Sequence, residues 1–206
     1  TYIMNAKDLN LASHIKEILD SGVVDSIKIE GRTKTSYYAA VTAKAYRMAI
    51  DDYYADKIES DRYQYELNSL QNRGYTDAYL VSRPFEKHDT QSLDFTMQLG
   101  THQVSGQVDA RGTHFLCKYK TLPNDELEIV APLESKIQLV DNEIGTTYER
   151  DGRLYMKLKQ LIAENKKIWQ EVHSGNINPI VLPTNMPPYT FLRIPSSLDM
   201  GAYPKK

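Results

Sequence analysis

Four charged side chains in one short stretch have the types and spacing to handle an anion. Lys28, Glu30, Arg32 and Lys34 alternate along the run Lys-Ile-Glu-Gly-Arg-Thr-Lys. An arginine fork binds a carboxylate or a phosphate through two parallel hydrogen bonds, and a lysine adds a compact positive charge. A carboxylate beside them supplies an acid, a base or an ion-pair partner. The spacing suggests an anion-binding site, with Glu30 and Arg32 as the candidate catalytic residues.

The elements around this stretch are predicted to hold it at the end of a strand. Val23–Glu30 alternates apolar and charged residues, which predicts a strand, and Gly31 permits a sharp turn. Thr35–Ser36 supplies an N-cap for the helix that follows. In α/β folds, chemistry collects at the carboxyl ends of parallel strands. If both faces of the strand are buried in a barrel, Lys28 and Glu30 must pair with each other, with a neighbour or with a ligand.

Two simpler interpretations stay open from spacing alone. Such a charge cluster also suits a solvated turn that caps a helix. Ile29-Glu30-Gly31-Arg32 is in addition the recognition sequence of a protease used to remove tags, which would indicate an engineered linker. Its place inside a continuous strand–turn–helix pattern, with no tag beside it, disfavours the linker.

A longer set of motifs around this turn resembles the peptidase U32, or collagenase-like, family. The motifs are Asn5-Ala-Lys-Asp-Leu9, Ser26-Ile-Lys-Ile-Glu-Gly-Arg-Thr-Lys-Thr-Ser-Tyr-Tyr38, Ala45-Tyr-Arg-Met-Ala-Ile-Asp51 and Asn72-Arg-Gly-Tyr-Thr-Asp-Ala-Tyr79. Within the family, the sequence is most similar to the branch that hydroxylates a wobble uridine of bacterial tRNA with prephenate as precursor. The resemblance is strong over residues 1–80 and looser over about 90 to 195.

The resemblance implies site residues, a co-substrate and a longer protein. It assigns Glu30 and Arg32 to the active rim. Substrate-binding roles are expected for Asn5, Lys7, Lys28, Lys34 and Tyr37. Prephenate is the implied co-substrate, and any iron–sulfur cluster is expected on cysteines of a preceding barrel segment, which makes this chain a C-terminal portion that is inactive alone. Within the chain we expect no cofactor and no metal site, because the single cysteine, Cys117, cannot build a four-cysteine cluster.

Composition sets bounds on the class of protein. The chain has 206 residues, 41% apolar and 25% charged, which is typical of a globular protein. Its formal net charge of −2 predicts that any contact with tRNA is local. No apolar run approaches the length of a membrane span. A lone cysteine suits a reducing cytoplasm.

Periodicity predicts an α+β chain in several parts. The expected order is the last two βα units of a TIM-like barrel in residues 1–82, a linker in 83–92, a small antiparallel β-barrel in 93–195 and a loose tail in 196–206. A short strand is expected at Tyr2–Met4, followed by a helix between Asn5 as N-cap and Gly22. Helical spacing also favours helices near residues 36–52, 60–72 and 159–173, the first of which carries Tyr38, Val41, Ala45, Met48 and Asp52 along one stripe. Period-two alternation predicts strands at 104–108, 115–119, 126–130, 136–140, 146–149, 153–158, 180–182 and 189–194.

Polar residues of the predicted β-barrel are candidates for contacts with RNA. Basic and aromatic side chains interleave there and could form an RNA-holding face, although a mixed solvated exterior is the simpler interpretation. The set is Arg111, Lys118, Lys120, Arg153, Tyr119, Tyr148 and Tyr155. His102 and His114 flank a predicted hairpin and are expected to form a cross-strand polar pair, rather than a metal site. Cys117 is expected in the core.

The function expected for the whole protein is tRNA wobble-uridine hydroxylation, in which the β-barrel helps to hold tRNA. The first alternative is a collagenase-like protease, although no protease motif is visible. The second is a protein-binding module without catalysis. An incomplete barrel would also leave a parallel strand edge and apolar helix faces exposed, which predicts self-association.

Overall fold

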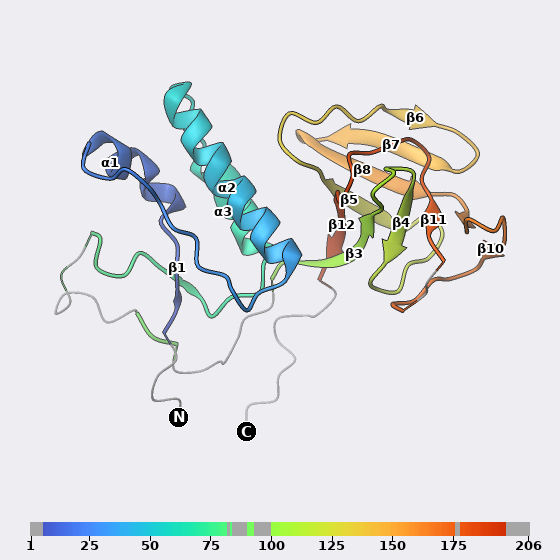
Figure 1. Ribbon diagram of the computed structural model, residues 1–206, viewed down its shortest axis with the longest axis horizontal. Coiled ribbons are helices and arrows are strands. Elements are labelled where there is room, and N and C mark those ends of the chain that lie inside the picture. Colours follow the sequence, from blue (N-terminus) through green and yellow to red (C-terminus); the bar gives the residue numbers. More distant parts are fainter. Residues whose placement is uncertain (1–5, 82, 84–89, 93–99, 176–177, 197–206) are drawn as a thin grey trace. The chain divides into compact units, whose positions relative to one another are not determined.

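The computed structural model describes residues 6–81, 83, 90–92, 100–175 and 178–196. The chain divides into two compact units, residues 1–101 and residues 102–206. The first unit is mainly helical and the second is a β structure (Figure 1). The fold is therefore mixed α and β, as predicted. No helix among the described residues is long and apolar enough to cross a membrane.

The first unit is built around two helices, α2 (Ser36–Tyr54) and α3 (Ser60–Asn68), which pack against each other (Figure 1). Thr35 caps α2, as predicted, because its side chain accepts a hydrogen bond from the backbone N–H of Tyr38. The Tyr63 hydroxyl of α3 donates to the Asp52 carboxylate of α2 at 2.7 Å and ties the two helices together.

The apolar faces of α2 and α3 form the core of this unit. The stripe on α2 begins at Tyr37 and not, as predicted, at Tyr38, because Tyr37 lies one helical turn before Val41 on the same face. The buried apolar residues of the unit are Ala12, Ile15, Tyr37, Val41, Ala45, Met48, Ala49, Tyr63, Leu67 and Leu70.

Short elements complete the first unit. A 3-10 turn, η1 (Ala12–His14), leads into α1 (Ile15–Asp20), so regular α-helix begins later than predicted. The expected strand ahead of Asn5 lies outside the described residues. β1 (Asp8–Leu9) pairs in parallel with β2 (Tyr75–Thr76). Among the described residues, this two-residue ladder is the one parallel strand pair. The βα units of a TIM-like barrel therefore remain a prediction.

The predicted strand over Val23–Glu30 is wrong for this structure. Residues 23–30 have no regular secondary structure and every one of them is exposed. A strand needs a neighbour to exchange backbone hydrogen bonds with, and no described segment pairs with these residues. The parallel edge expected to drive self-association is therefore absent from the described residues.

The second unit is an antiparallel sheet whose order is β11-β4-β3-β12-β5-β8-β7-β6. Its strands are β3 (His102–Val108), β4 (His114–Cys117), β5 (Glu126–Val130), β6 (Val140–Asp141), β7 (Gly145–Arg150), β8 (Arg153–Leu158), β11 (Ile180–Val181) and β12 (Phe191–Pro195). Most predicted strands are confirmed, but residues 136–139 of the strand predicted at 136–140 have no regular structure, and β6 begins only at Val140. The sheet curls (Figure 1), but the order of described strands has two ends, so a closed barrel also stays a prediction.

The predicted helix over residues 159–173 is wrong. The segment instead forms β9 (Leu161–Ile162) and β10 (Ile168–Trp169), which pair with each other around a turn. Val172 exchanges both backbone hydrogen bonds with Thr121, at 2.8 and 3.0 Å. Lys166 takes a left-handed conformation with φ of 65° inside the turn. These backbone bonds to partners outside the segment outweigh its helical spacing of apolar residues.

The core of the second unit lies on one face of the sheet. Its fully buried members include Val108, Phe115, Leu127, Met156, Leu158, Leu161, Ile180 and Leu192. Cys117 is buried with them, as predicted, and its thiol donates to the carbonyl of Tyr119 at 2.6 Å. The register pairs Thr147 with Met156, which places the alternate residues of β7 and β8 on the opposite face.

Candidate functional site

The charged turn of residues 28–34 lies at the surface of the first unit. Lys28 Nζ is 3.2 Å from a carboxylate oxygen of Glu30, with 84% and 71% of the two side chains exposed. The pair forms as one of the predicted alternatives, but solvent rather than a barrel surrounds it. Arg32 and Lys34 are exposed as well. The turn therefore offers cations at the surface, where a carboxylate or phosphate can reach them.

Tyr38 links this turn to the rest of the unit. The Lys34 ammonium lies 5.1 Å from the centre of the Tyr38 ring. A Cβ placed on Gly31 would come 3.3 Å from the same ring, so the backbone of the turn packs closely on it. Burial raises the pKa of the Tyr38 hydroxyl, and the negative charge of Asp8 raises it further.

Asp8 and Arg73 form a bidentate ion pair that sequence reasoning missed. The Arg73 guanidinium donates through Nε and Nη2 to Asp8 Oδ1 at 2.9 and 2.6 Å, and the Arg73 backbone N–H donates to Oδ2 at 3.1 Å. The pair joins the first residue of β1 to the segment just before β2. Sixty-five positions separate the two residues, so no local spacing signals their contact.

The remaining predicted substrate-binding residues fall in different surroundings. Asn5 lies outside the described residues. Lys7 is half-buried, and its methylene chain runs along Gly74, 3.4 Å from where a Cβ of that glycine would stand. Tyr37 is buried, with its hydroxyl 3.3 Å from Ser69 Oγ. The structure thus gathers Lys28, Lys34 and their neighbours in the turn, while Tyr37 belongs to the helical core.

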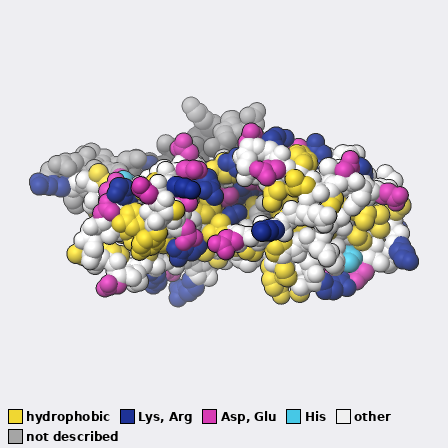
Figure 2. All heavy atoms as spheres, turned by 90° about the horizontal axis from the view of Figure 1, so that it is seen from above, with side chains coloured by type: hydrophobic (Ala, Val, Ile, Leu, Met, Phe, Trp, Pro, Cys, Tyr) yellow, Lys and Arg dark blue, Asp and Glu magenta, His cyan; other side chains and the backbone are white. Residues whose placement is uncertain are grey.

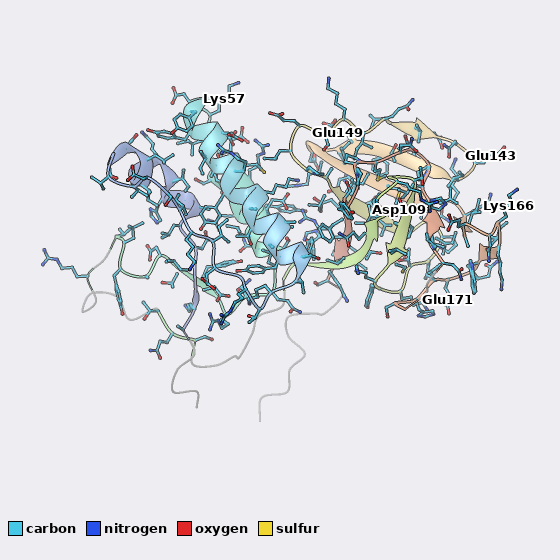
Figure 3. The ribbon with its side chains drawn as sticks, in the orientation of Figure 1. Lys57, Asp109, Glu143, Glu149, Lys166 and Glu171 are labelled. Atoms are coloured by element: carbon cyan, nitrogen blue, oxygen red, sulfur yellow. The ribbon has the colours of Figure 1, made fainter. Side chains whose placement is uncertain are left out.

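The basic and aromatic set predicted on the second unit separates into two groups. Arg111 is held by Asp109 at 2.9 Å and by Glu164 at 2.8 Å. Lys120 is held by Glu171 at 2.8 Å. Asp109 and Glu171, both labelled in Figure 3, thus neutralise these two cations. This group lies beside β4. Three strands, β3, β12 and β5, separate β4 from β8 in the sheet.

The second group assembles on the outer face of β7 and β8. We call Glu126, Tyr148, Arg150, Tyr155 and Lys157 the tyrosine platform. The two tyrosines are directly opposite in the register, and their rings stack with centres 5.8 Å apart. The Arg150 guanidinium lies 4.3 Å over the Tyr155 ring, and Lys157 Nζ lies 5.8 Å over the Tyr148 ring. Tyr148 and Tyr155 were predicted members, whereas Arg150, Lys157 and Glu126 were missed.

One carboxylate organises the platform. Glu126 accepts hydrogen bonds from the Tyr148 hydroxyl and from Arg150 Nη2, the latter at 2.7 Å, and lies 3.2 Å from Lys157 Nζ. These donors, Arg150 first, lower the pKa of Glu126 to about 2. Partial burial and the negative charge of Glu126 raise the pKa of the Tyr148 hydroxyl to about 12. At neutral pH the carboxylate is ionised and the phenol keeps its proton.

Next to the platform, the same face carries a fully buried ion pair. Arg193 donates through Nε and Nη2 to the two carboxylate oxygens of Glu128, at 3.0 and 2.7 Å. Arg193 has no exposed surface. Arg153 Nε lies 3.9 Å from Glu128 and His102 Nε2 lies 3.4 Å from it. This cluster fixes β5 to β12, and we assign it a structural role.

The predicted His102–His114 pair is wrong. The register places Pro195 opposite His102, while His114 lies 4.0 Å from Asp109 and 2.8 Å from the Thr113 hydroxyl. β3 and β4 pair only over Gly106–Val108, so His102 lies outside the paired part of this hairpin. Within the described ranges, no group of three or more His, Cys, Asp or Glu side chains could hold a metal ion.

Charge is spread over the surface. Lysine and arginine side chains intermingle with carboxylates across the described atoms of the face seen in Figure 2, consistent with the net charge of −2. Electrostatic attraction for a polyanion is therefore set by local groups.

Residues 1–90 match the sequence model of peptidase family U32. The chain is 46% identical over 193 residues to tRNA hydroxylation protein P of Helicobacter pylori, which covers 94% of this chain and 46% of that protein. It is 35% identical over 156 residues to tRNA hydroxylation protein P of Haemophilus influenzae, covering 72% of this chain and 34% of that protein. The chain thus spans about half the length, or less, of these curated relatives.

A protease-named relative matches a smaller part of the chain. An uncharacterised protease of Methanocaldococcus jannaschii is 38% identical over 94 residues, which is 44% of this chain and 22% of that protein. No solved structure matches. Similarity to proteins named for tRNA hydroxylation therefore extends through both units, whereas the match to the protease-named relative is shorter than either unit.

Proposed function

We propose that the protein, whose residues 1–90 match the model of peptidase family U32, belongs to that family and acts in the hydroxylation of tRNA. The turn of residues 28–34 contributes to the reaction site, and the sheet of the second unit helps to hold the RNA. The observation that carries the proposal is the 46% identity to a tRNA hydroxylation protein over 94% of the chain. A likeness of that extent includes both units.

The exposed cations of the turn support a role with an anionic substrate. Arg32 and Lys34 lie free of the core on the surface of the first unit. A guanidinium fork matches the carboxylates of prephenate, the co-substrate that the resemblance implies, and equally the phosphates of RNA. Glu30, positioned by Lys28 at 3.2 Å, is the group that accepts or donates a proton there. The proposed base is the wobble uridine, which places the protein in the cytoplasm with its tRNA.

The proposal also concerns the domains. It assigns residues 1–82 to a TIM-like catalytic domain, residues 83–92 to a linker, residues 93–195 to a small β-barrel and residues 196–206 to a tail, while residues 23–30 form no barrel strand in this structure. An iron–sulfur cluster does not fit the residues of this chain, since its single cysteine, Cys117, is buried in the β core and hydrogen-bonded to Tyr119.

A nucleoside profile of total tRNA tests the proposal. A bacterial strain that lacks the complete gene for this protein is compared with the same strain after the gene is restored, and hydroxylated uridine is quantified by mass spectrometry. We expect the modification to disappear and to return. An unchanged profile in both strains contradicts the proposal, and cleavage of gelatin by the purified full-length protein would then support the protease alternative.

A further inference from the structure

The side chains of the tyrosine platform take no part in packing the core of the second unit. Its five side chains lie on the face opposite to Met156 and Leu158, which fill the core. The side chains of Arg150 and Lys157 are 50% and 44% exposed, so a ligand can reach both cations. Stacked tyrosine rings beneath an exposed guanidinium form a flat, layered surface.

Four cations on this face, Arg150, Arg153, Lys157 and Arg193, share two carboxylates: Glu126 pairs with Arg150 and Lys157, while Glu128 pairs with Arg193 and lies 3.9 Å from Arg153. Arg150 and Arg153 are directly opposite across the β7–β8 pair, at the turn between the two strands. Like charges in that position destabilise a sheet. Glu126 is shared by Arg150 and Lys157 at 2.7 and 3.2 Å, so one carboxylate balances two cations. A bound anion would offset the remaining repulsion.

We propose that the tyrosine platform binds unpaired nucleotides of RNA, an inference that rests on the proposed function and gives it a specific site. A base stacks on the layer formed by Arg150 over Tyr155. The flanking phosphates contact Lys157 and Arg153. Bases stack on aromatic rings and on guanidinium planes in this way, and any base offers the flat face that stacking needs.

The hydrogen bonds of the platform explain why it is ready to bind. Glu126 fixes the Tyr148 hydroxyl, the Arg150 guanidinium and the Lys157 ammonium at once. Side chains already held in the binding geometry lose less conformational freedom when a ligand arrives. The hairpin that carries them is itself rigid, because β7 and β8 pair at six consecutive positions from Gly145 to Arg150. Of the residues labelled in Figure 3, Glu143 precedes β7 and Glu149 lies in it, next to its last residue Arg150.

The arrangement favours single strands over duplex RNA. A paired and stacked base does not present its ring face, whereas a base in a loop does. Two other cations of the second unit are already paired with carboxylates. Arg111 is neutralised by Asp109 and Glu164, and Lys120 by Glu171.

Fluorescence anisotropy with two labelled RNAs tests the inference on this chain. The probes are a single-stranded oligouridine of eight nucleotides and a blunt duplex of equal length. We expect tighter binding of the single strand, and we expect Tyr155→Ala to weaken it roughly tenfold or more, as loss of one stacking ring does. Tyr189→Ala is the matched control, because Tyr189 is an exposed tyrosine of the same unit outside the platform. An equal effect of both substitutions overturns the inference.

The salt dependence of binding gives a second, independent readout. Lys157→Ala is expected to reduce the slope of log Kd against log salt by about one, since it removes one phosphate-facing cation. Arg111→Ala removes the same charge from the same unit and is expected to leave the slope unchanged. Absence of RNA binding by the wild-type chain, or equal slopes for the two variants, overturns the inference.

These results separate the inference from the proposed function. If the tRNA profile depends on the gene but Tyr155→Ala does not weaken RNA binding, RNA binding by the platform is contradicted and the proposed function is still supported. If Tyr155→Ala weakens RNA binding but deletion of the gene leaves the tRNA profile unchanged, RNA binding by the platform is supported and tRNA hydroxylation is contradicted.

Discussion

The turn of residues 28–34 and the tyrosine platform contain similar side chains in different settings. Each places a carboxylate beside a lysine, at 3.2 Å in both cases, and each sets a cation over a tyrosine ring. The turn has no regular backbone partner, while the platform lies on paired strands. The difference shows that residue types suggest a chemistry, but backbone pairing decides how firmly the side chains are held.

The largest effect is expected where the sheet buries charge completely. Arg193→Ala would leave Glu128 buried without its bidentate partner, and loss of one partner of a buried pair costs about 3–5 kcal/mol. Urea unfolding followed by the fluorescence of Trp169, the single tryptophan of this chain, measures the change. Arg111→Ala, which removes an exposed arginine of the same unit, is the control. Equal unfolding midpoints for the two variants would contradict the structural role of the buried pair.

A second prediction concerns the strand pair beneath the platform. A Cβ on Gly145 would lie 2.4 Å from the carbonyl oxygen of Lys157, so Gly145→Ala must push β7 away from β8, at a cost of about 2–3 kcal/mol. Gly152 has a φ of +70° in the turn of the same hairpin, with no atom within 4 Å of an added Cβ. Gly152→Ala is therefore expected to cost only the backbone strain, about 1 kcal/mol. The same unfolding measurement compares the two variants. A larger loss of stability for Gly152→Ala than for Gly145→Ala would show that the hairpin is not tightly paired.

The third prediction uses pH to distinguish the contribution of the Glu126 carboxylate to stability from that of the Glu30 carboxylate. Glu126 has a pKa lowered to about 2 from an unperturbed value of 4.5. Its ionised form is therefore stabilised by folding, and this contribution is complete above about pH 4.5 and is lost as pH falls toward about 2. Glu126→Gln should lower the unfolding midpoint at pH 7, and its deficit should shrink as the pH is lowered through that window. Glu30→Gln is the control, because solvent screens its exposed pair with Lys28. A deficit for Glu126→Gln that is constant from pH 7 to pH 3 would contradict the network.

The smallest effect on stability is expected in the turn. Arg32 is exposed, so Arg32→Ala should change the free energy of unfolding by less than about 0.5 kcal/mol. The helical circular dichroism signal, to which α2 and α3 contribute, measures this free energy during urea unfolding. A loss above 1 kcal/mol, on the scale expected for contacts in the interior, would show that Arg32 supports the fold instead of a substrate.

The sequence predicted the second unit better than the first for a physical reason. Alternation at Glu126–Val130 and Arg153–Leu158 became strands at the predicted residues, because each found a neighbouring strand within the sheet. Alternation at Val23–Glu30 was equally regular but found no partner among the described residues. The helical spacing at 159–173 gave way to backbone bonds with Thr121, which no local pattern reveals.

The candidate sites show the same limit. Arg32 and Lys34 could be chosen from the motif because they lie within a few residues of each other. The platform was only half found, since Glu126 reaches Arg150 across β8 and the register of three strands is needed to bring them together. The Asp8–Arg73 pair was missed for the same reason. Tyr37 was proposed for substrate binding, and its burial depends on which face of α2 meets α3.

One measurement tests the central claim most directly, which is that the turn serves the hydroxylation of tRNA. The strain that lacks the gene receives the complete gene with Arg32→Ala, or with Arg47→Ala as a control. Arg47 is an exposed arginine of the same unit, paired with Asp51 on α2. With equal protein levels, we predict that hydroxylated uridine returns with Arg47→Ala and stays absent with Arg32→Ala. Full return of the modification with Arg32→Ala would contradict the assignment of the turn to the reaction site.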